Sequence, residues 1–172
     1  VGVAANYYYD GNGLLTKYTH PALAAAGILY AYDANGYLTR ETSPTGVYTD
    51  YEFDALGRQT KVIQDSGGLD IDVTSYYDDL GNRTRVTDPR GKDTYYYYGD
   101  ISCGGCGGGG QLTKVVDALS NESKLQYDAD GLLTKFIDRA SVEKCYEYNC
   151  MGRLTRKTFP GGGAGAATLS YN

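Results

Sequence analysis

Four cysteine residues have the spacing best suited to chemistry in this 172-residue sequence. Cys103 and Cys106 form a C-x2-C pair followed by four glycines, and Cys145 and Cys150 form a C-x4-C pair. Four thiolates can hold zinc, and paired cysteines can form disulfides. Zinc is the weaker interpretation, because Cys145 is expected in a strand and Cys150 in a tight turn. Spacing alone leaves a disulfide, free thiols and a metal site open.

Other reactive residues do not form a catalytic pattern. His20 is the only histidine, so a nucleophile–base pair would depend on it, and no other residue points to such a pair. Residues 128–131 (DADG) resemble the start of a calcium loop, but Lys135 and Phe136 follow where an acidic ligand is needed. The glycine runs lack the Lys-Ser/Thr of a phosphate-binding loop. We therefore expect no enzyme activity, no catalytic residue, no metal and no cofactor.

The composition favours β-structure outside the nucleic-acid-binding classes. The chain has 19 Tyr, 24 Gly and no Trp, and Tyr, Thr and Val suit half-buried pleated surfaces. A net charge of -5 argues against a nucleic-acid partner, which requires a basic surface. No apolar stretch approaches the roughly 20 residues of a membrane span, and no signal peptide is visible.

One short sequence phrase recurs along the chain, and its spacing predicts the structural units in which any functional residue would lie. It consists of an aromatic residue, usually Asp, two variable residues, Gly, two more residues, Thr and a base. Successive Asp or Asn positions lie 21 to 24 residues apart, except for a gap of 50 that holds a degenerate copy with a Cys/Gly-rich insert at 99–110. Such periods are typical of repeat arrays. The aromatic positions are Tyr9, Tyr32, Phe53, Tyr77, Tyr127, Tyr148 and, at the start of an eighth copy, Tyr171.

Residues 1–172 are therefore predicted to form a single array of about seven units plus the start of an eighth. We interpret the chain as a segment of a longer protein. A residue that recurs in every unit is expected to serve architecture rather than catalysis.

Each copy predicts a β-hairpin. Asp at the first turn position and Gly at the fourth are typical of a type I turn that a left-handed residue closes. In four units the link between copies carries a turn of its own with Gly and, in three of them, Pro, at 42–46, 64–68, 87–91 and 159–162. We expect an all-β meander of antiparallel strands with two alternating turn types. The turn residues are Asp10, Gly13, Asp33, Gly36, Asp54, Gly57, Asp78, Gly81, Asp128, Gly131, Asn149 and Gly152.

The second copy indicates which side chains should share a face. In a regular hairpin Tyr32 faces Leu38 and Tyr30 faces Arg40, so alternation places the aromatic residues and the base on one face and Thr39 on the other. The bases would then form a column of like charges, which is unfavourable. We expect each base to lie over a tyrosine ring in a cation–π contact. The bases are Lys17, Arg40, Lys61, Arg85, Lys114, Lys135 and Arg156.

The YDxxG phrase with its Thr-Lys/Arg ending resembles the RHS or YD repeat family over essentially the whole chain. That family includes bacterial RHS polymorphic toxins, the B–C components of insecticidal toxin complexes, and animal teneurins. The resemblance implies a β-sheet that spirals into a shell or tube wall. In the toxins the shell encloses a toxic domain, and in teneurins it serves adhesion. This sequence has neither the terminal self-cleaving region nor a toxin domain.

The resemblance implies a non-enzymatic structural protein of the bacterial cell surface or exterior. Neighbouring YD repeats, of this polypeptide or of other copies, are the expected partners, with an enclosed toxin cargo or surface glycans as further possibilities. One alternative is a self-assembling extracellular fibre, and another is an adhesion or carbohydrate-binding module. An extracellular setting favours a disulfide between Cys103 and Cys106, or one that links this insert to Cys145 or Cys150 in the seventh unit.

Overall fold

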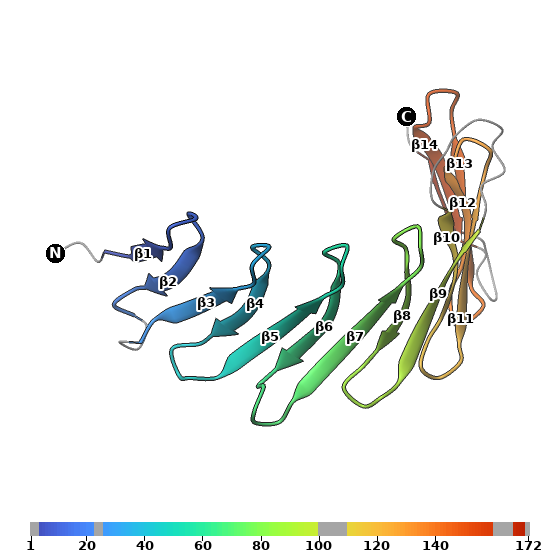
Figure 1. Cartoon of the computed structure of the whole chain (residues 1–172). Coiled ribbons are helices and arrows are strands. Elements are labelled where there is room, and N and C mark those ends of the chain that lie inside the picture. Colours follow the sequence, from blue (N-terminus) through green and yellow to red (C-terminus); the bar gives the residue numbers. More distant parts are fainter. Residues whose placement is uncertain (1–3, 23–25, 100–109, 160–166, 171–172) are drawn as a thin grey trace. The chain divides into compact units, whose positions relative to one another are not determined.

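The computed structural model describes residues 4–22, 26–99, 110–159 and 167–170, which contain strands and turns but no helix. Figure 1 shows the strands following one another as hairpins. Their order in the sheet is their order in the chain, and each strand pair whose register is defined is antiparallel. The predicted all-β hairpin array is thus confirmed. The strands are β1 (Asn6–Tyr9), β2 (Leu15–Thr19), β3 (Ile28–Tyr32), β4 (Leu38–Thr42), β5 (Tyr48–Phe53), β6 (Gln59–Gln64), β7 (Ile71–Tyr77), β8 (Arg83–Thr87), β9 (Asp93–Gly99), β10 (Gln111–Val116), β11 (Glu122–Tyr127), β12 (Leu133–Ile137), β13 (Glu143–Tyr148), β14 (Leu154–Phe159) and β15 (Ala167–Ser170).

The chain divides into two compact units. The first comprises Val1–Ser75 with Thr87–Gly91, and the second comprises Tyr76–Val86 with Lys92–Asn172. Within the first unit, β1 to β6 and the start of β7 pair in sequence. Within the second, β9 to β15 do the same.

Three link turns have the same backbone hydrogen bonds as the turns of the phrase, so the expected second turn type is wrong for these links. The link at Asp65 differs, because the N–H groups of Gly68 and Asp70 both donate to the Asp65 carbonyl. In the Asp10 turn, the N–H of Gly13 donates to the Asp10 carbonyl, and the N–H of Asp10 donates to the Leu14 carbonyl. The link turn at Ser43 repeats both bonds, and two link turns without Pro or Gly do so as well. In those two, Ser120 and Ser141 take the left-handed position with φ of 64° and 62°. These link turns therefore form the same backbone hydrogen bonds as the turns of the phrase, although their sequences differ.

The two kinds of hairpin differ in register instead. A hairpin that contains the turn of the phrase is called a YD hairpin here, and one that joins two copies is called a link hairpin. In every YD hairpin with a defined register, the strand pairing shifts by one residue beside the repeat aromatic. The link hairpins pair without such a shift. In the second copy Tyr32 faces Leu38 as predicted, but Ala31 faces Arg40 and Tyr30 faces Glu41. A β-bulge at Thr39 accounts for the shift. Because one extra residue reverses the alternation, Arg40 lies on the face opposite the repeat aromatic, contrary to the expectation.

The sheet has no enclosed core in the part of the chain that the structure describes. No hydrophobic side chain there is buried, and the strand side chains are mostly half-buried. A domain of ordinary architecture buries one face of its sheet against another layer. Each unit is instead a single layer of strands with both faces open.

Candidate functional site

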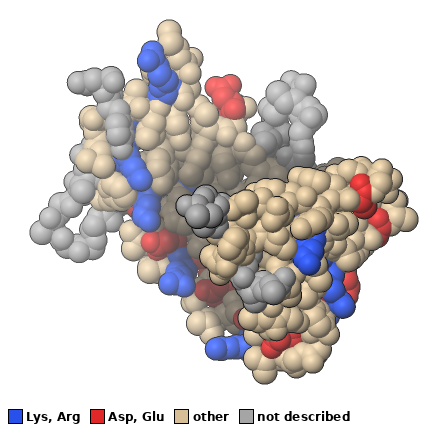
Figure 2. Space-filling model, turned by 90° about the vertical axis from the view of Figure 1, so that its left-hand side faces the viewer, with Lys and Arg blue, Asp and Glu red and all other residues tan. Residues whose placement is uncertain are grey.

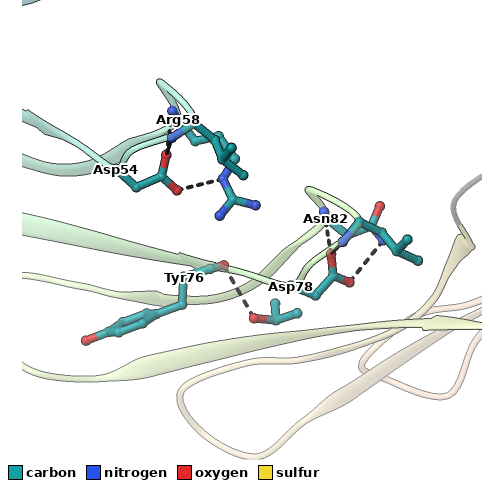
Figure 3. Close-up of polar contacts among 8 residues, drawn as sticks. Asp54, Arg58, Tyr76, Asp78 and Asn82 are labelled. Carbon is teal, nitrogen blue, oxygen red and sulfur yellow. Dashed lines mark hydrogen bonds and ion pairs between the residues drawn. The ribbon is translucent and has the colours of Figure 1, made fainter.

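The first recurring element is the side-chain cap of the turn in each phrase, formed by an Asp carboxylate or, at Asn149, by an amide oxygen. The Oδ1 atom of the first turn residue accepts hydrogen bonds from the backbone N–H groups two and four positions later, at 2.8–3.1 Å. Figure 3 shows this cap at Asp54, where the Arg58 side chain adds a 2.7 Å contact, and at Asp78, where the Asn82 amide adds one of 3.0 Å. The backbone N–H of Arg58 is the main cause that lowers the pKa of Asp54. These caps fix the turns.

The second element is the threonine of the bulge. Six of these hydroxyls donate to the carbonyl of the residue before the repeat aromatic, at 3.0–3.4 Å. Figure 3 includes the bond that the Tyr76 carbonyl accepts from Thr84. A bulge leaves backbone groups unpaired, and the hydroxyl provides a partner for one of them. The bonding threonines are Thr16, Thr39, Thr84, Thr113, Thr134 and Thr155.

The third element joins one copy to the next. The hydroxyls of Tyr32, Tyr98, Tyr127 and Tyr148 each donate to the carbonyl just before the preceding copy's threonine, at 2.9–3.1 Å. Phe53 lacks a hydroxyl, and its ring stacks on Tyr37 with centroids 5.0 Å apart. A repeat tyrosine therefore links neighbouring hairpins by a hydrogen bond in addition to its packing contacts.

The strand registers give each unit an aromatic face. We use this name for the side that bears the repeat aromatics. In the first unit it holds Tyr9, Leu15, Tyr18, Tyr30, Tyr32, Tyr51, Phe53, Val62 and Val73. In the second it holds Tyr96, Tyr98, Leu112, Tyr127, Leu133, Phe136, Lys144, Tyr146, Tyr148, Leu154 and Lys157. Burial raises the pKa of five of its tyrosines, namely Tyr30, Tyr51, Tyr98, Tyr127 and Tyr148.

The opposite side of each unit is a charged face. It bears Lys17, Arg40, Asp50, Lys61 and Asp72 in the first unit, and Arg85, Asp93, Tyr97, Lys114, Glu122, Lys124, Lys135, Glu143, Glu147 and Arg156 in the second. In the view of Figure 2, the visible Lys and Arg side chains are interspersed with Asp and Glu rather than gathered into one basic patch.

Carboxylates, rather than tyrosine rings alone, separate the bases of the repeat. Three bases lie over tyrosine rings as expected: Arg40 over Tyr48, Arg85 over Tyr76 and Lys114 over Tyr97, at 4.1, 3.7 and 4.3 Å. Six of the seven also contact an acidic side chain, in the pairs Arg40–Asp50, Lys61–Asp72, Arg85–Asp93, Lys114–Glu122, Lys135–Glu143 and Arg156–Glu147.

The sequence contained a signal for most of these pairs. In five of the six, the acidic residue follows the base by eight to eleven positions, which places it on the next strand. Contact with Glu143 raises the pKa of Lys135, and contacts with Lys124 and Lys114 lower the pKa of Glu122. Along the charged face, basic and acidic side chains on adjacent strands therefore form pairs of opposite charge.

The chemically reactive residues do not assemble into a site. Cys145 is half-buried and Cys150 is exposed, and both are free thiols. Cys103, Cys106 and Tyr171 lie outside the described residues, so the predicted disulfide stays a prediction. Within the described ranges, no three His, Cys, Asp or Glu side chains form a cluster that could hold a metal ion. Those ranges also contain no helix with the length and apolar character that a membrane crossing requires.

Comparisons with known proteins agree with this geometry. Residues 32–69 match the family model for the RHS repeat. A comparison with curated proteins gives no match. A solved structure of the Photorhabdus luminescens Tc holotoxin pore, with a substitution in TccC3, is similar to this chain at 16% identity and a TM-score of 0.60. A crystal structure of TcdB2–TccC3–Cdc42 is similar at 16% identity and a TM-score of 0.61.

The extent of these matches limits what they show. Each covers 99% of this chain but only 12% of the solved chain. At this identity the likeness concerns the fold, which is the antiparallel hairpin array described above. The matched segment spans one whole hairpin copy with its link, and the same phrase recurs before and after it. Residues 32–69 therefore match an RHS repeat, and the other copies of the phrase resemble this segment.

Proposed function

We propose that this chain is a non-enzymatic segment of the wall of an extracellular shell or tube, of the kind that RHS/YD repeats build. The observation that carries the proposal is the single-layer sheet with two chemically different faces. No described hydrophobic side chain is buried, yet neighbouring copies are tied by backbone ladders and tyrosine hydroxyls. Such a layer suits a wall, because it extends by adding copies and has a different chemistry on each side.

The recurring contacts support an architectural role for the phrase that this chain repeats. Each part of the phrase has a structural partner: Asp caps the turn, Thr bonds the bulge, the aromatic hydroxyl reaches the preceding copy, and the base meets a carboxylate. A residue with the same structural task in every copy needs no catalytic role to explain it. The proposed partners are neighbouring RHS/YD repeats of the same polypeptide or of other copies.

The solved Tc toxin complexes support the proposed setting. They are structures of a Tc holotoxin pore and of TcdB2–TccC3–Cdc42. By analogy of fold, we place this chain in a secreted or cell-surface bacterial assembly whose wall encloses a polypeptide cargo.

Electron microscopy of the native full-length protein tests the proposal. Closed hollow particles are expected. Continuous filaments would instead support a fibre and overturn the shell, and solid globular particles would overturn both.

A matched pair of variants links the particles to this array. Val62 lies inside β6 and pairs with Tyr51 and Val73 on both sides, so Val62→Pro should remove a ladder bond and abolish the particles. Ala55 occupies the second position of the Asp54 turn, where Pro is favoured, so Ala55→Pro should preserve them. Intact particles with Val62→Pro would show that this array is not part of the wall.

A further inference from the structure

Two lysines on the aromatic face of the second unit are not part of the recurring phrase. Lys144 lies on β13 opposite Phe136, and Lys157 lies on β14 opposite Tyr146. Lys144 comes four residues before the repeat aromatic, where every other copy has an uncharged residue. Lys157 comes two residues after the threonine of the phrase. In the other six copies that position holds Tyr18, Glu41, Val62, Val86, Val115 and Phe136.

The two lysines form one cluster with three aromatic rings, which we call the lysine patch: Phe136, Lys144, Tyr146, Lys157 and Phe159. The Nζ atom of Lys144 lies 5.3 Å from the centre of the Phe136 ring. The Nζ atom of Lys157 lies 5.4 Å and 5.0 Å from the centres of the Tyr146 and Phe159 rings. The register of β13 and β14, which are adjacent in Figure 1, makes the two lysines diagonal neighbours with Cα atoms roughly 7–8 Å apart.

The lysine patch lacks the carboxylates that balance the charged face. None of the residues that the registers place on the aromatic face of this unit is acidic. Lys144 reaches the Asp138 carboxylate at 3.8 Å, close to the outer limit for an ion pair. No ion pair joins Lys157 to a carboxylate of the described residues. The two ammonium groups therefore repel each other with little compensation.

The patch is open on the side away from the sheet. The side chains of Phe136, Tyr146 and Phe159 are half-buried, and no described hydrophobic side chain is fully buried beneath a second layer. A ring contact stabilises one side of an ammonium group, and its three N–H donors also allow contacts with a ligand. The face therefore presents two amine donors beside apolar rings.

This combination favours an acidic polypeptide over other anions. A carboxylate placed between the two amines would relieve their repulsion, and apolar side chains of the same polypeptide would pack on the rings. Inorganic phosphate would contact the amines but leave the rings uncovered. A nucleic acid requires a longer row of bases, and an anionic membrane surface is typically bound by clusters of about four to eight.

We propose that the lysine patch binds an acidic polypeptide segment that also carries apolar side chains. The inference goes beyond the wall function and does not depend on it, because the patch belongs to the second unit itself, whether the array is part of a shell or of a fibre. It gives a binding role to two bases that the repeat architecture does not use.

Fluorescence anisotropy of labelled, end-blocked peptides with the 172-residue chain tests the proposal. The probes are GEELFEELG, its amide analogue GQQLFQQLG and its basic analogue GKKLFKKLG. In an extended peptide of this pattern, each side carries both charged and apolar residues. The acidic peptide should bind roughly five- to thirtyfold more tightly than the amide analogue, the gain expected from two partly exposed ion pairs, and the basic analogue should bind most weakly. Added salt should weaken the binding of the acidic peptide.

Two results would overturn the proposal at this stage. One is equal affinity for the acidic and amide peptides, or no binding of the acidic peptide. The other is binding to phosphatidylserine-containing vesicles without binding to the acidic peptide, which would identify a membrane surface as the partner.

Three variants locate the binding. Lys157→Gln should weaken binding of the acidic peptide by roughly two- to fivefold, the loss expected for one partly exposed ion pair. Lys157→Arg should retain the binding, because the positive charge remains. Lys124→Gln is the matched control, since Lys124 lies on the charged face of the same unit and the substitution removes the same charge. Unchanged circular dichroism spectra would show that the variants are folded. Equal weakening by Lys124→Gln, or none by Lys157→Gln, would overturn the assignment to the lysine patch.

Discussion

At the scale of single residues, the repeat phrase is a set of hydrogen-bond partners for backbone groups. The threonine hydroxyl bonds a carbonyl beside the bulge, and the tyrosine hydroxyl bonds a carbonyl of the preceding hairpin. Both side chains thereby satisfy groups that the ladder alone leaves unpaired. The chemistry of the phrase is therefore local and repeated, which explains its uniformity without invoking a reaction.

Removing one threonine hydroxyl should cost measurable stability. Thr39 Oγ1 donates to the Ala31 carbonyl at 3.2 Å, so Thr39→Val should lower the free energy of unfolding by about 0.5–1.5 kcal/mol. Thr49→Val is the control, because Thr49 lies in a link hairpin opposite Glu41 and Gln64. Urea denaturation should show a lower midpoint for the first variant alone. Equal midpoints would mean that the bulge does not need the hydroxyl.

Alkaline pH should weaken the aromatic face. Burial raises the pKa of Tyr127, whose hydroxyl donates to the Leu112 carbonyl. Because the folded pKa exceeds the unfolded value of about 10, this contribution is complete below pH 10 and is lost as pH rises through the folded pKa. Thermal unfolding followed by circular dichroism should therefore shift to lower temperature above about pH 10. Tyr127→Phe should be less stable than the parent at neutral pH and should lose less on alkalinisation, and an identical pH response would contradict this account.

At the scale of the hairpin, the turn was predictable and the register was not. Asp and Gly determine the turn within five residues, so their spacing located Asp33 and Gly36 correctly as neighbours in a turn. The bulge at Thr39 depends on pairing across two strands, and a threonine has no local signature for it. A regular hairpin without the bulge places Arg40 on the face of the repeat aromatic. The pattern for a regular hairpin therefore could not predict the contact between Arg40 and Asp50.

The hairpin tips also contact one another along the first unit. Gly57 has φ of 78°, and a Cβ there would collide with the Tyr37 hydroxyl of the preceding copy. Gly36 has a similar φ of 85° but only Leu14 nearby, at 3.9 Å. Left-handed backbone costs an alanine about 1–2 kcal/mol at either position.

Gly57→Ala should therefore destabilise the protein more than Gly36→Ala. The first substitution combines backbone strain with a steric clash, and the second has the strain alone. Thermal unfolding measures the difference, and adding Tyr37→Ala should bring the cost of Gly57→Ala down to that of Gly36→Ala. If the two glycine variants lose equal stability, the contact between neighbouring tips is absent.

At the scale of the whole molecule, the proposed wall function depends on the different chemistry of the two faces more than on any single residue. Periodicity and composition could predict a β-array, because each copy repeats the same turn residues and the same strand-forming residues. They could not predict which side chains share a face, because that depends on the bulge in every YD hairpin. The result is a layer with the repeat aromatics on one side and the paired bases of the repeat on the other, and no hydrophobic side chain of the described residues is buried.

The lysines of the two faces provide the most direct test of the wall. Lys61, Lys114 and Lys135 lie on the charged face, and Lys144 and Lys157 lie on the aromatic face. A bulky amine-reactive polymer can be applied to the native full-length protein and to the 172-residue chain, with the modified residues quantified by mass spectrometry. In the short chain both sets should react. In the native protein one whole set should be protected while the other reacts, and equal modification of both sets there would contradict the wall.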